Sequence, residues 1–188
     1  NATYKFNSNG SSYTYMYYTN SEAKTTLESW YQTNIGSKKD LASSVASGNY
    51  YCEQAKAKYA DYYTSGNATM TTYKSYTPDF KCVTDGNGKG VVNASIGLLT
   101  YDEVVYAGGY FNQNNSNYYL NNSAIYWWTM SPAGFPDSYS YVWRVHMSGA
   151  VSSNTVTTTT YAVRPVLILN ADTLATGSGT SSDPFVVS

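Results

Sequence analysis

The stretch Tyr141-Val-Trp-Arg-Val-His-Met147 decides the fold, because large apolar residues stand at every second position in it. Successive side chains of a β-strand point to opposite faces, so this spacing predicts a strand with one buried face. Ser148-Gly149 predicts a turn, and residues 150–156 predict the strand that returns. The centre of the fold is therefore expected to be a β-hairpin in the second half of the chain.

Further strands are predicted on both sides of this hairpin. The Trp-rich stretch 126–132 begins the β-rich half, a strongly apolar strand follows at 162–169, and residues 183–187 close the chain with a turn and a terminal strand. We expect the β-rich half to cover about residues 124–188 and a helical half about residues 1–110, within a single domain spanning 1–188. The polar stretch 112–122 between them predicts a surface loop.

The helical half opens with the aromatic stretch 13–19, which predicts a strand. Thr19-Asn-Ser-Glu22 has the spacing of a capping box and predicts the start of a helix that ends near Gly36. An apolar stripe at helical intervals should pack on the sheet: Ala23, Leu27, Trp30 and Tyr31. Shorter helices are predicted at 39–46, 55–63 and 101–107, the last one capped by Thr100. The two halves together predict the α+β class.

The composition excludes two classes of partner. Charged residues are only 12% of the chain, and 11 Lys and Arg nearly balance 12 Asp and Glu. Binding to nucleic acid or to an anionic membrane needs a concentrated basic face, so neither is expected. The 22 Tyr and four Trp residues are instead typical of extracellular binding surfaces, in which Tyr combines rigid contact area with a hydrogen-bonding hydroxyl. The alternative for any single Tyr is a half-buried position on a strand.

The two cysteines, Cys52 and Cys82, favour one disulfide, because a chain with a single His is a poor zinc binder. The alternative is a pair of free, buried thiols. A disulfide indicates an exported protein, and no apolar run is long enough to span a bilayer. The chain lacks an initiator Met and a leader, so we expect a mature fragment of an extracellular or cell-surface protein whose signal or anchor lies upstream.

No catalytic or metal-binding pattern is evident in the sequence. The only histidine, His146, has no Gly-x-Ser-x-Gly nucleophile elbow to serve and is interpreted as a surface residue or a ligand contact. Asp102 and Glu103 fall in the first turn of a predicted helix, where acidic side chains favour the positive helix end. Asp85-Gly-Asn-Gly-Lys-Gly90 lacks the third ligand of a calcium loop and predicts a glycine turn. We therefore expect a protein that is not an enzyme and that has no metal or cofactor.

Arg144 and Arg164 lie in predicted strands that are otherwise poor in charge. A guanidinium within a strand needs acceptors, so we expect each to be paired with a carboxylate or a backbone carbonyl inside the fold. The tryptophans of the β-rich half are interpreted as core residues first and as platforms for a glycan second: Trp127, Trp128 and Trp143.

Three blocks of the sequence form a pattern: Trp128-Thr-Met-Ser-Pro132, Val163-Arg-Pro165 and Gly179-Thr-Ser-Ser-Asp-Pro-Phe-Val186. Together they resemble a family of secreted domains from anaerobic gut bacteria, although Ala162 stands where that family usually has Gly. The resemblance implies a C-type-lectin-like fold of the formylglycine-generating-enzyme subtype, with N-terminal helices packed on a small, mostly antiparallel, twisted sheet and with long irregular loops. The reactive cysteines of that enzyme have no counterpart here, so its chemistry is not carried over.

The same scaffold is used by the variable proteins of diversity-generating retroelements, and this resemblance implies a variable binding surface within residues 133–160. Adenine-directed mutation of an AAC codon gives codons for Thr, Ser, His, Asp and Phe but not for Trp or Met. The predicted ligand-facing residues are Phe135, Asp137, Ser138, Tyr139, His146, Ser152, Ser153, Asn154, Thr155, Thr157, Thr158, Thr159 and Thr160. The alternative for the stretch 152–160 is a Thr-rich edge strand.

The sequence therefore predicts a non-catalytic receptor or adhesin domain whose partner is a protein or a glycan at a cell surface. The alternative is the structural head of a pilus-like subunit, which would self-assemble through a segment N-terminal to this chain. Saturable binding by the isolated head would favour the first hypothesis, and polymer formation by the intact precursor would favour the second.

Overall fold

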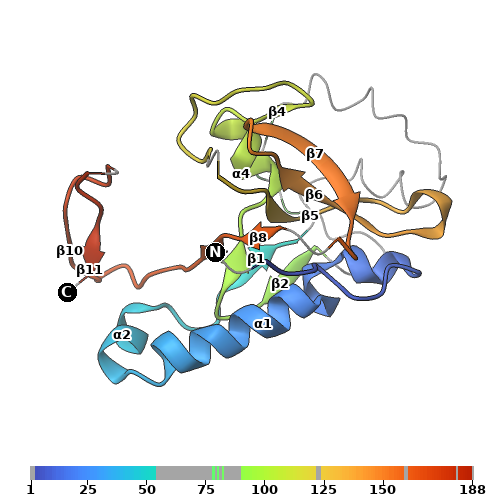
Figure 1. The fold of residues 1–188 in the computed structure, drawn as a ribbon. Helices are drawn as coiled ribbons and strands as arrows, with labels where there is room; N and C mark the ends of the chain where they lie inside the picture. The colour runs from blue at the N-terminus through green and yellow to red at the C-terminus, as the bar shows by residue number, and fades with distance from the viewer. Residues whose placement is uncertain are drawn as a thin grey trace.

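A five-stranded sheet forms the centre of the structure, a computed structural model that describes residues 3–53, 78, 80, 82, 90–121, 124–158, 161–180 and 182–187. Its strands are β4 (Tyr110–Phe111), β5 (Trp127–Gly134), β6 (Tyr141–Val145), β7 (Ala150–Thr155) and β8 (Ala162–Val163), in the spatial order β4-β7-β6-β5-β8 (Figure 1). The three inner strands are antiparallel to one another, whereas both edge strands run parallel to their neighbours. The predicted hairpin is the pair β6 and β7.

Both faces of this sheet are buried, which differs from the single buried face that the alternation predicted. Val142 and Trp143 are neighbours on opposite faces of β6, and neither has exposed surface. On one face Trp128 and Val142 pack against the N-terminal segments. On the other face Trp127 and Trp143 pack against helix α4 (Tyr101–Tyr106). Strands covered on both faces are apolar at most positions, so the alternation along β6 does not distinguish a buried face from an open one.

The aromatic stretch 13–19 forms two 3₁₀ helices, η1 (Tyr13–Met16) and η2 (Tyr18–Asn20), so the strand predicted there is wrong. Ser12 begins η1, because its side chain accepts a hydrogen bond from the backbone N–H of Thr14. The two turns bury Met16, Tyr17 and Tyr18 completely. The β-propensity of an aromatic residue mainly reflects how well its side chain packs within a sheet. The buried aromatic side chains of residues 13–19 pack in the layer that covers the sheet instead.

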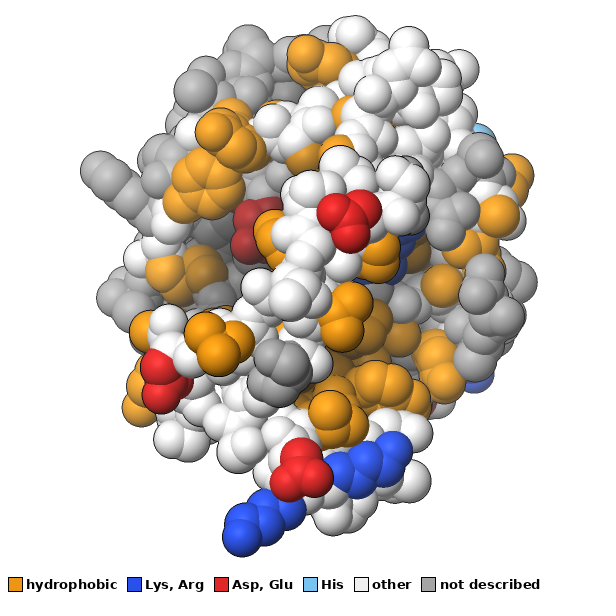
Figure 2. Space-filling view, turned by 90° about the vertical axis from the view of Figure 1, so that its left-hand side faces the viewer, with side chains coloured by type: hydrophobic (Ala, Val, Ile, Leu, Met, Phe, Trp, Pro, Cys, Tyr) orange, Lys and Arg blue, Asp and Glu red, His pale blue; other side chains and the backbone are white. Residues whose placement is uncertain are grey.

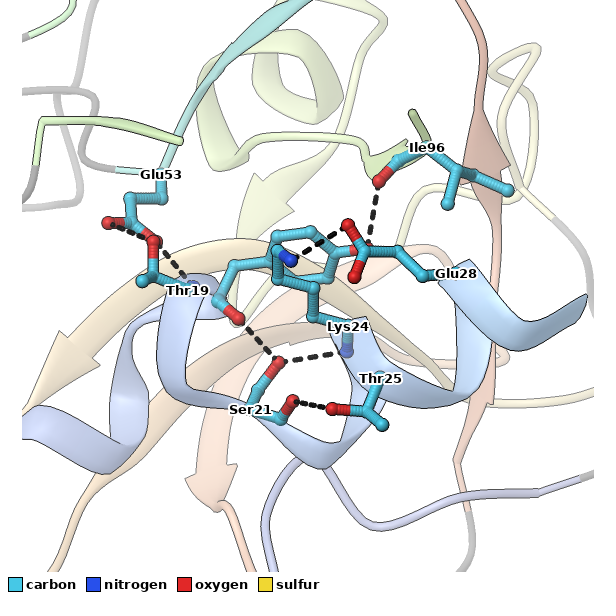
Figure 3. Close-up of polar contacts among 8 residues, drawn as sticks. Thr19, Ser21, Lys24, Thr25, Glu28, Glu53 and Ile96 are labelled. Carbon is cyan, nitrogen blue, oxygen red and sulfur yellow. Dashed lines mark hydrogen bonds and ion pairs between the residues drawn. The ribbon is translucent and has the colours of Figure 1, made fainter. Parts of the chain in front are cut away.

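Helix α1 (Glu22–Tyr31) begins at Ser21 rather than at the predicted cap Thr19. The Ser21 hydroxyl accepts a hydrogen bond from the backbone N–H of Lys24 at 3.0 Å. Thr19 instead donates to the buried Glu53 carboxylate, from its backbone N–H at 2.7 Å and from its hydroxyl at 3.1 Å (Figure 3). Glu53 directly follows strand β1 (Tyr50–Cys52), so these hydrogen bonds link the end of η2 to the end of β1.

Three residues of the predicted α1 stripe are buried, but the fourth is not. Ala23, Leu27 and Tyr31 face the core, whereas Trp30 is 46% exposed, and its predicted packing on the sheet is wrong. Each helical residue is rotated by about 100° from the one before, so burying Tyr31 turns its neighbour outward. The Trp30 ring lies at a groove of about 210 Å³ that is also lined by Tyr4 and Val163.

Shorter elements surround the sheet. The π-helical turn η3 (Gln32–Gly36) and helix α2 (Lys39–Ser44) continue from α1, and η5 (Pro136–Ser138) lies between β5 and β6. Three two-stranded ladders complete the described residues: β1 with β2 (Val91–Asn93), β3 (Gly97–Leu98) with β9 (Pro165–Val166), and β10 (Ala175–Thr176) with β11 (Val186–Val187). In Figure 1 the β10–β11 hairpin lies apart from the rest of the chain. Thr100 and Glu103 form the capping box of α4, which confirms the predicted start of that helix.

The long apolar strand predicted at 162–169 is broken into β8 and β9, which belong to different sheets. Arg164 stands between them, donates a hydrogen bond to the backbone carbonyl of Leu120 and lies 4.7 Å from the centre of the Trp127 ring. Arg164 thus has the carbonyl partner that the sequence predicted. Met147, expected on the buried face of β6, lies beyond its end and is 38% exposed.

Helices and small sheets in this arrangement confirm the α+β class. The disulfide between Cys52 and Cys82 is also confirmed, with the two Cα atoms 5.4 Å apart. Along the described ranges, no helix has the length and apolar character needed to cross a membrane. The helix predicted at 55–63 and the glycine turn predicted at 85–90 lie outside the described residues.

The disulfide should protect both cysteines from alkylation. Native protein treated with iodoacetamide without a reductant should gain no alkyl group in intact-mass analysis. The bridge spans 30 positions, so on the chain-entropy model the Cys52→Ser/Cys82→Ser variant should lose about 3–4 kcal/mol of unfolding free energy in denaturant titrations. Two alkyl groups on the unreduced protein would contradict the pairing.

The two tryptophans Trp30 and Trp128 should differ in their contribution to stability. Trp128 has no exposed surface, so Trp128→Ala should lower the unfolding free energy by about 3–5 kcal/mol. Trp30→Ala removes a half-exposed ring and should cost less than about 1 kcal/mol. Urea titrations of both variants measure the difference, and equal losses would show that the burial described for α1 is wrong.

Candidate functional site

The predicted ligand-facing residues come from three places: the loop that contains η5, the β6–β7 turn with His146, and the strand β7 with its following turn. In the loop, Asp137, Ser138 and Tyr139 are exposed, whereas Phe135 is partly buried and packs edge-on against Tyr13, with ring centres 6.5 Å apart. The φ angles of Asp137 and Ser138 are 51° and 62°, in the left-handed region that costs most residues about 1–2 kcal/mol. These two positions are therefore exposed but do not accept every side chain equally well.

The pleat of β7 divides the other predicted residues between two faces. Ser152 lies opposite Arg144 in the β6–β7 ladder, and Asn154 lies two residues further along the same face. Ser153 and Thr155 point to the opposite face, which packs against α4. Because successive side chains alternate, the continuous polar stretch in the sequence does not form one continuous surface.

The threonines after β7 support one another in a turn. The backbone N–H of Thr155 donates to the side-chain oxygen of Asn154 at 2.8 Å, and the N–H of Thr158 donates to the carbonyl of Thr155 at 3.1 Å. The hydroxyls of Thr155 and Thr158 are 3.1 Å apart, and Thr157 is partly buried. These contacts favour a structural role for the Thr-rich turn. Two predicted residues lie outside the described part of the chain: Thr159 and Thr160.

The face that carries Ser152 also holds a cluster that the sequence did not single out. The Arg144 guanidinium lies 4.8 Å from the ring centre of Tyr126 and 5.1 Å from that of Tyr161. The two rings stack on each other with centres 5.2 Å apart. We call Tyr126, Arg144, His146, Asn154 and Tyr161 the arginine cluster. Its cation contacts aromatic faces, an interaction worth about 0.5–2 kcal/mol.

Two hydrogen bonds hold the aromatic rings of the arginine cluster in place. The backbone N–H of Ser148 donates to Nδ1 of His146 at 3.0 Å, so the neutral imidazole carries its proton on Nε2. That Nε2–H donates to the hydroxyl of Tyr126 at 2.6 Å. The side-chain amide of Asn154 donates to the hydroxyl of Tyr161 at 2.6 Å. His146 and Asn154, both predicted as ligand-facing, therefore position tyrosines that contact Arg144.

The charge of Arg144 is not neutralised by any described residue. Its Nε and Nη1 atoms are buried and have no hydrogen-bond partner within the described ranges. The ion pair found in that part of the chain joins Lys24 to Glu28 at 2.7 Å, on α1. The partner predicted for Arg144, a carboxylate or a backbone carbonyl, is thus wrong for the described residues, because its ladder neighbours are Trp128 and Ser152.

The electrostatics around the cluster are simple. Burial and the nearby charge of Arg144 lower the pKa of His146, so the imidazole is neutral at neutral pH. On the face drawn in Figure 2, charged side chains are few, and basic and acidic ones lie close together at its lower edge. The arginine cluster therefore presents one positive charge, with neutral hydroxyl, amide and imidazole groups beside it.

Glu103 has a structural role in the fold. Glu103 accepts hydrogen bonds from the backbone N–H and the hydroxyl of Thr100 at 2.7 and 2.8 Å, as part of the α4 capping box. Asp102 is 1% exposed. Over the residues that the structure describes, no three His, Cys, Asp or Glu side chains come close enough to hold a metal ion.

The structure defines an α+β domain with a strand face on which one arginine is surrounded by aromatic and neutral polar side chains. Residues 4–171 match the family described as Domain of unknown function (DUF6273), and the chain belongs to that family. No curated protein and no solved structure matches the chain significantly. The description of this family names no activity, so the function is inferred from the site.

Acidification should destabilise the protein through His146. Its pKa is lower in the folded than in the unfolded chain, so the unfolded chain binds the proton first as the pH falls below about 6.5. The free energy of unfolding should therefore decrease below that pH and level off below the folded pKa. Urea titrations of wild type and His146→Gln between about pH 8 and about pH 5 measure this difference. The same pH dependence in both proteins would show that His146 is not responsible.

Proposed function

We propose that this chain is an extracellular, non-catalytic ligand-binding domain with a C-type-lectin-like fold, and that it binds its ligand on the β6–β7 face around Arg144. The observation that carries the proposal is the guanidinium of Arg144, which lies against two stacked tyrosine rings and whose Nε and Nη1 atoms have no hydrogen-bond partner among the described residues. Nη2 is not among the buried atoms of this guanidinium, so a ligand that places an acceptor there gains an interaction with a group that the two rings already position.

The groups around Arg144 suit recognition more than catalysis. Ser152 and Asn154 add a hydroxyl and an amide on the same partly buried face. The positions are set by strands with two buried faces, so a bound ligand would meet a rigid platform. The exposed loop residues Asp137, Ser138 and Tyr139 precede β6, at the end away from Arg144, and would form a second part of the binding surface, in keeping with a segment that varies between related proteins.

The overall organisation supports the extracellular part of the proposal. A disulfide joins Cys52 to Cys82, and such bonds persist mainly in oxidising compartments. Helix α1 packs its buried residues into the core on one face of the small sheet, as expected for the C-type-lectin-like scaffold (Figure 1). The low content of charged residues, 12% of the chain, suits a neutral or weakly charged ligand.

Binding by the isolated domain tests this proposal. The wild-type domain is screened on glycan and protein arrays, and each hit is measured by titration. Ser152→Tyr places a bulky ring beside Arg144 and should weaken binding at least about tenfold. Ser29→Tyr, an exposed position on α1, serves as the matched control and should leave the affinity unchanged.

Melting temperatures of both variants ensure that the comparison is made between folded proteins. Saturable binding that Ser152→Tyr does not weaken would move the site away from the β6–β7 face. Absence of saturable binding on both arrays, together with self-association of the longer precursor in sedimentation experiments, would replace the proposal by the structural head of a surface polymer.

A further inference from the structure

Building on the proposed function, we infer that the ligand is a glycan that carries a carboxylate, such as a chain with a hexuronic or sialic acid, and that Arg144 binds this carboxylate. The inference concerns the chemical class of the ligand at the β6–β7 face, which the proposed function leaves open.

Arg144 has no counter-charge among the described residues. Arg144 has a permanent positive charge, and its Nε and Nη1 donors have no hydrogen-bond partner among the described residues. No carboxylate of the described residues lies within ion-pair distance of it. Nη2 is not among the buried atoms of the guanidinium, so an anion can reach the side chain at this nitrogen. An anion at Nη2 would complete the pair that the described residues do not supply.

The number of positive charges in the arginine cluster selects the type of anion. Beside Arg144 the cluster contains only neutral groups, because the lowered pKa of His146 keeps its imidazole uncharged. Phosphate and sulfate sites commonly gather several cations or backbone N–H groups, whereas one planar guanidinium matches one carboxylate. The chain also has a net charge of -1, which gives no long-range attraction for a polyanion or for a strongly acidic protein.

The polar groups beside Arg144 select the rest of the ligand. Ser152 lies opposite Arg144 in the ladder, and Asn154 follows on the same face. Hydroxyl and amide groups beside a carboxylate-binding arginine suit the hydroxyls of a sugar ring that bears the carboxylate. The hydrogen bonds from His146 to Tyr126 and from Asn154 to Tyr161 hold the rings against which Arg144 lies, so the guanidinium is positioned before the ligand arrives.

The test compares ligands that differ only in their carboxylate. The wild-type chain is titrated with trigalacturonate and with sialyllactose, and then with the carboxyl-reduced trisaccharide and with lactose. We expect at least one acidic sugar to bind, and its neutral counterpart to bind at least about tenfold more weakly. Arg144→Gln should cause a similar loss, whereas Lys39→Gln, which removes an exposed charge on α2, should cause none.

The ligand comparison uses wild-type protein, so it remains decisive if Arg144→Gln does not fold. Equal binding of the acidic and neutral sugars would overturn the carboxylate inference and leave the proposed function intact. Binding of an acidic peptide in place of any acidic sugar would overturn the glycan class. Failure of both acidic sugars, while array ligands still bind at the Ser152 face, would also overturn the inference, whereas failure of every ligand would remove the proposed function itself.

Discussion

Strand β6 has to bury Val142 on one side and Trp143 on the other, so its sheet is stable only when two separate layers cover it. A hairpin of β6 and β7 would be marginal by itself. The N-terminal segments provide one layer and α4 with the following loop provides the other. Tyr4 ties the first layer to the sheet, because its backbone pairs with Tyr161 and its carbonyl accepts a hydrogen bond from the Trp128 indole at 3.1 Å. The first half of the chain is therefore part of the core that positions the site.

Local sequence patterns predicted the parts of the fold that local physics determines. The β6–β7 hairpin, the Thr100 helix cap and the α+β class depend on neighbours in the chain, and all are present. Residues 13–19 and Trp30 were predicted incorrectly because their environment is set by segments far away in the sequence. No period within the sequence shows whether an aromatic stretch packs within a sheet or above it.

The candidate site was predicted only in outline for the same reason. Ser152, Asn154 and His146 were identified from their polarity, and they do lie on or beside the face that carries Arg144. The sequence could not separate them from Ser153 and Thr155, because the register of the sheet decides which residues share a face. Arg144 itself was assigned an internal partner. The available signal in the sequence was a single arginine in an otherwise apolar strand. Only the pairing of the strands shows that the residues opposite Arg144, Trp128 and Ser152, are not acidic.

The C-terminal hairpin of β10 and β11 lies apart from the rest of the domain (Figure 1). The last described ties between the C-terminal segment and the body are made by Asn170 and Thr173, which bond to backbone carbonyls near the end of α2. Beyond them, β10 and β11 pair with each other, and Asp183 closes the connection through Ser178 and Thr180. The family match ends at residue 171, close to the same point. Substitutions in this hairpin should therefore leave the packing that holds the arginine cluster unchanged.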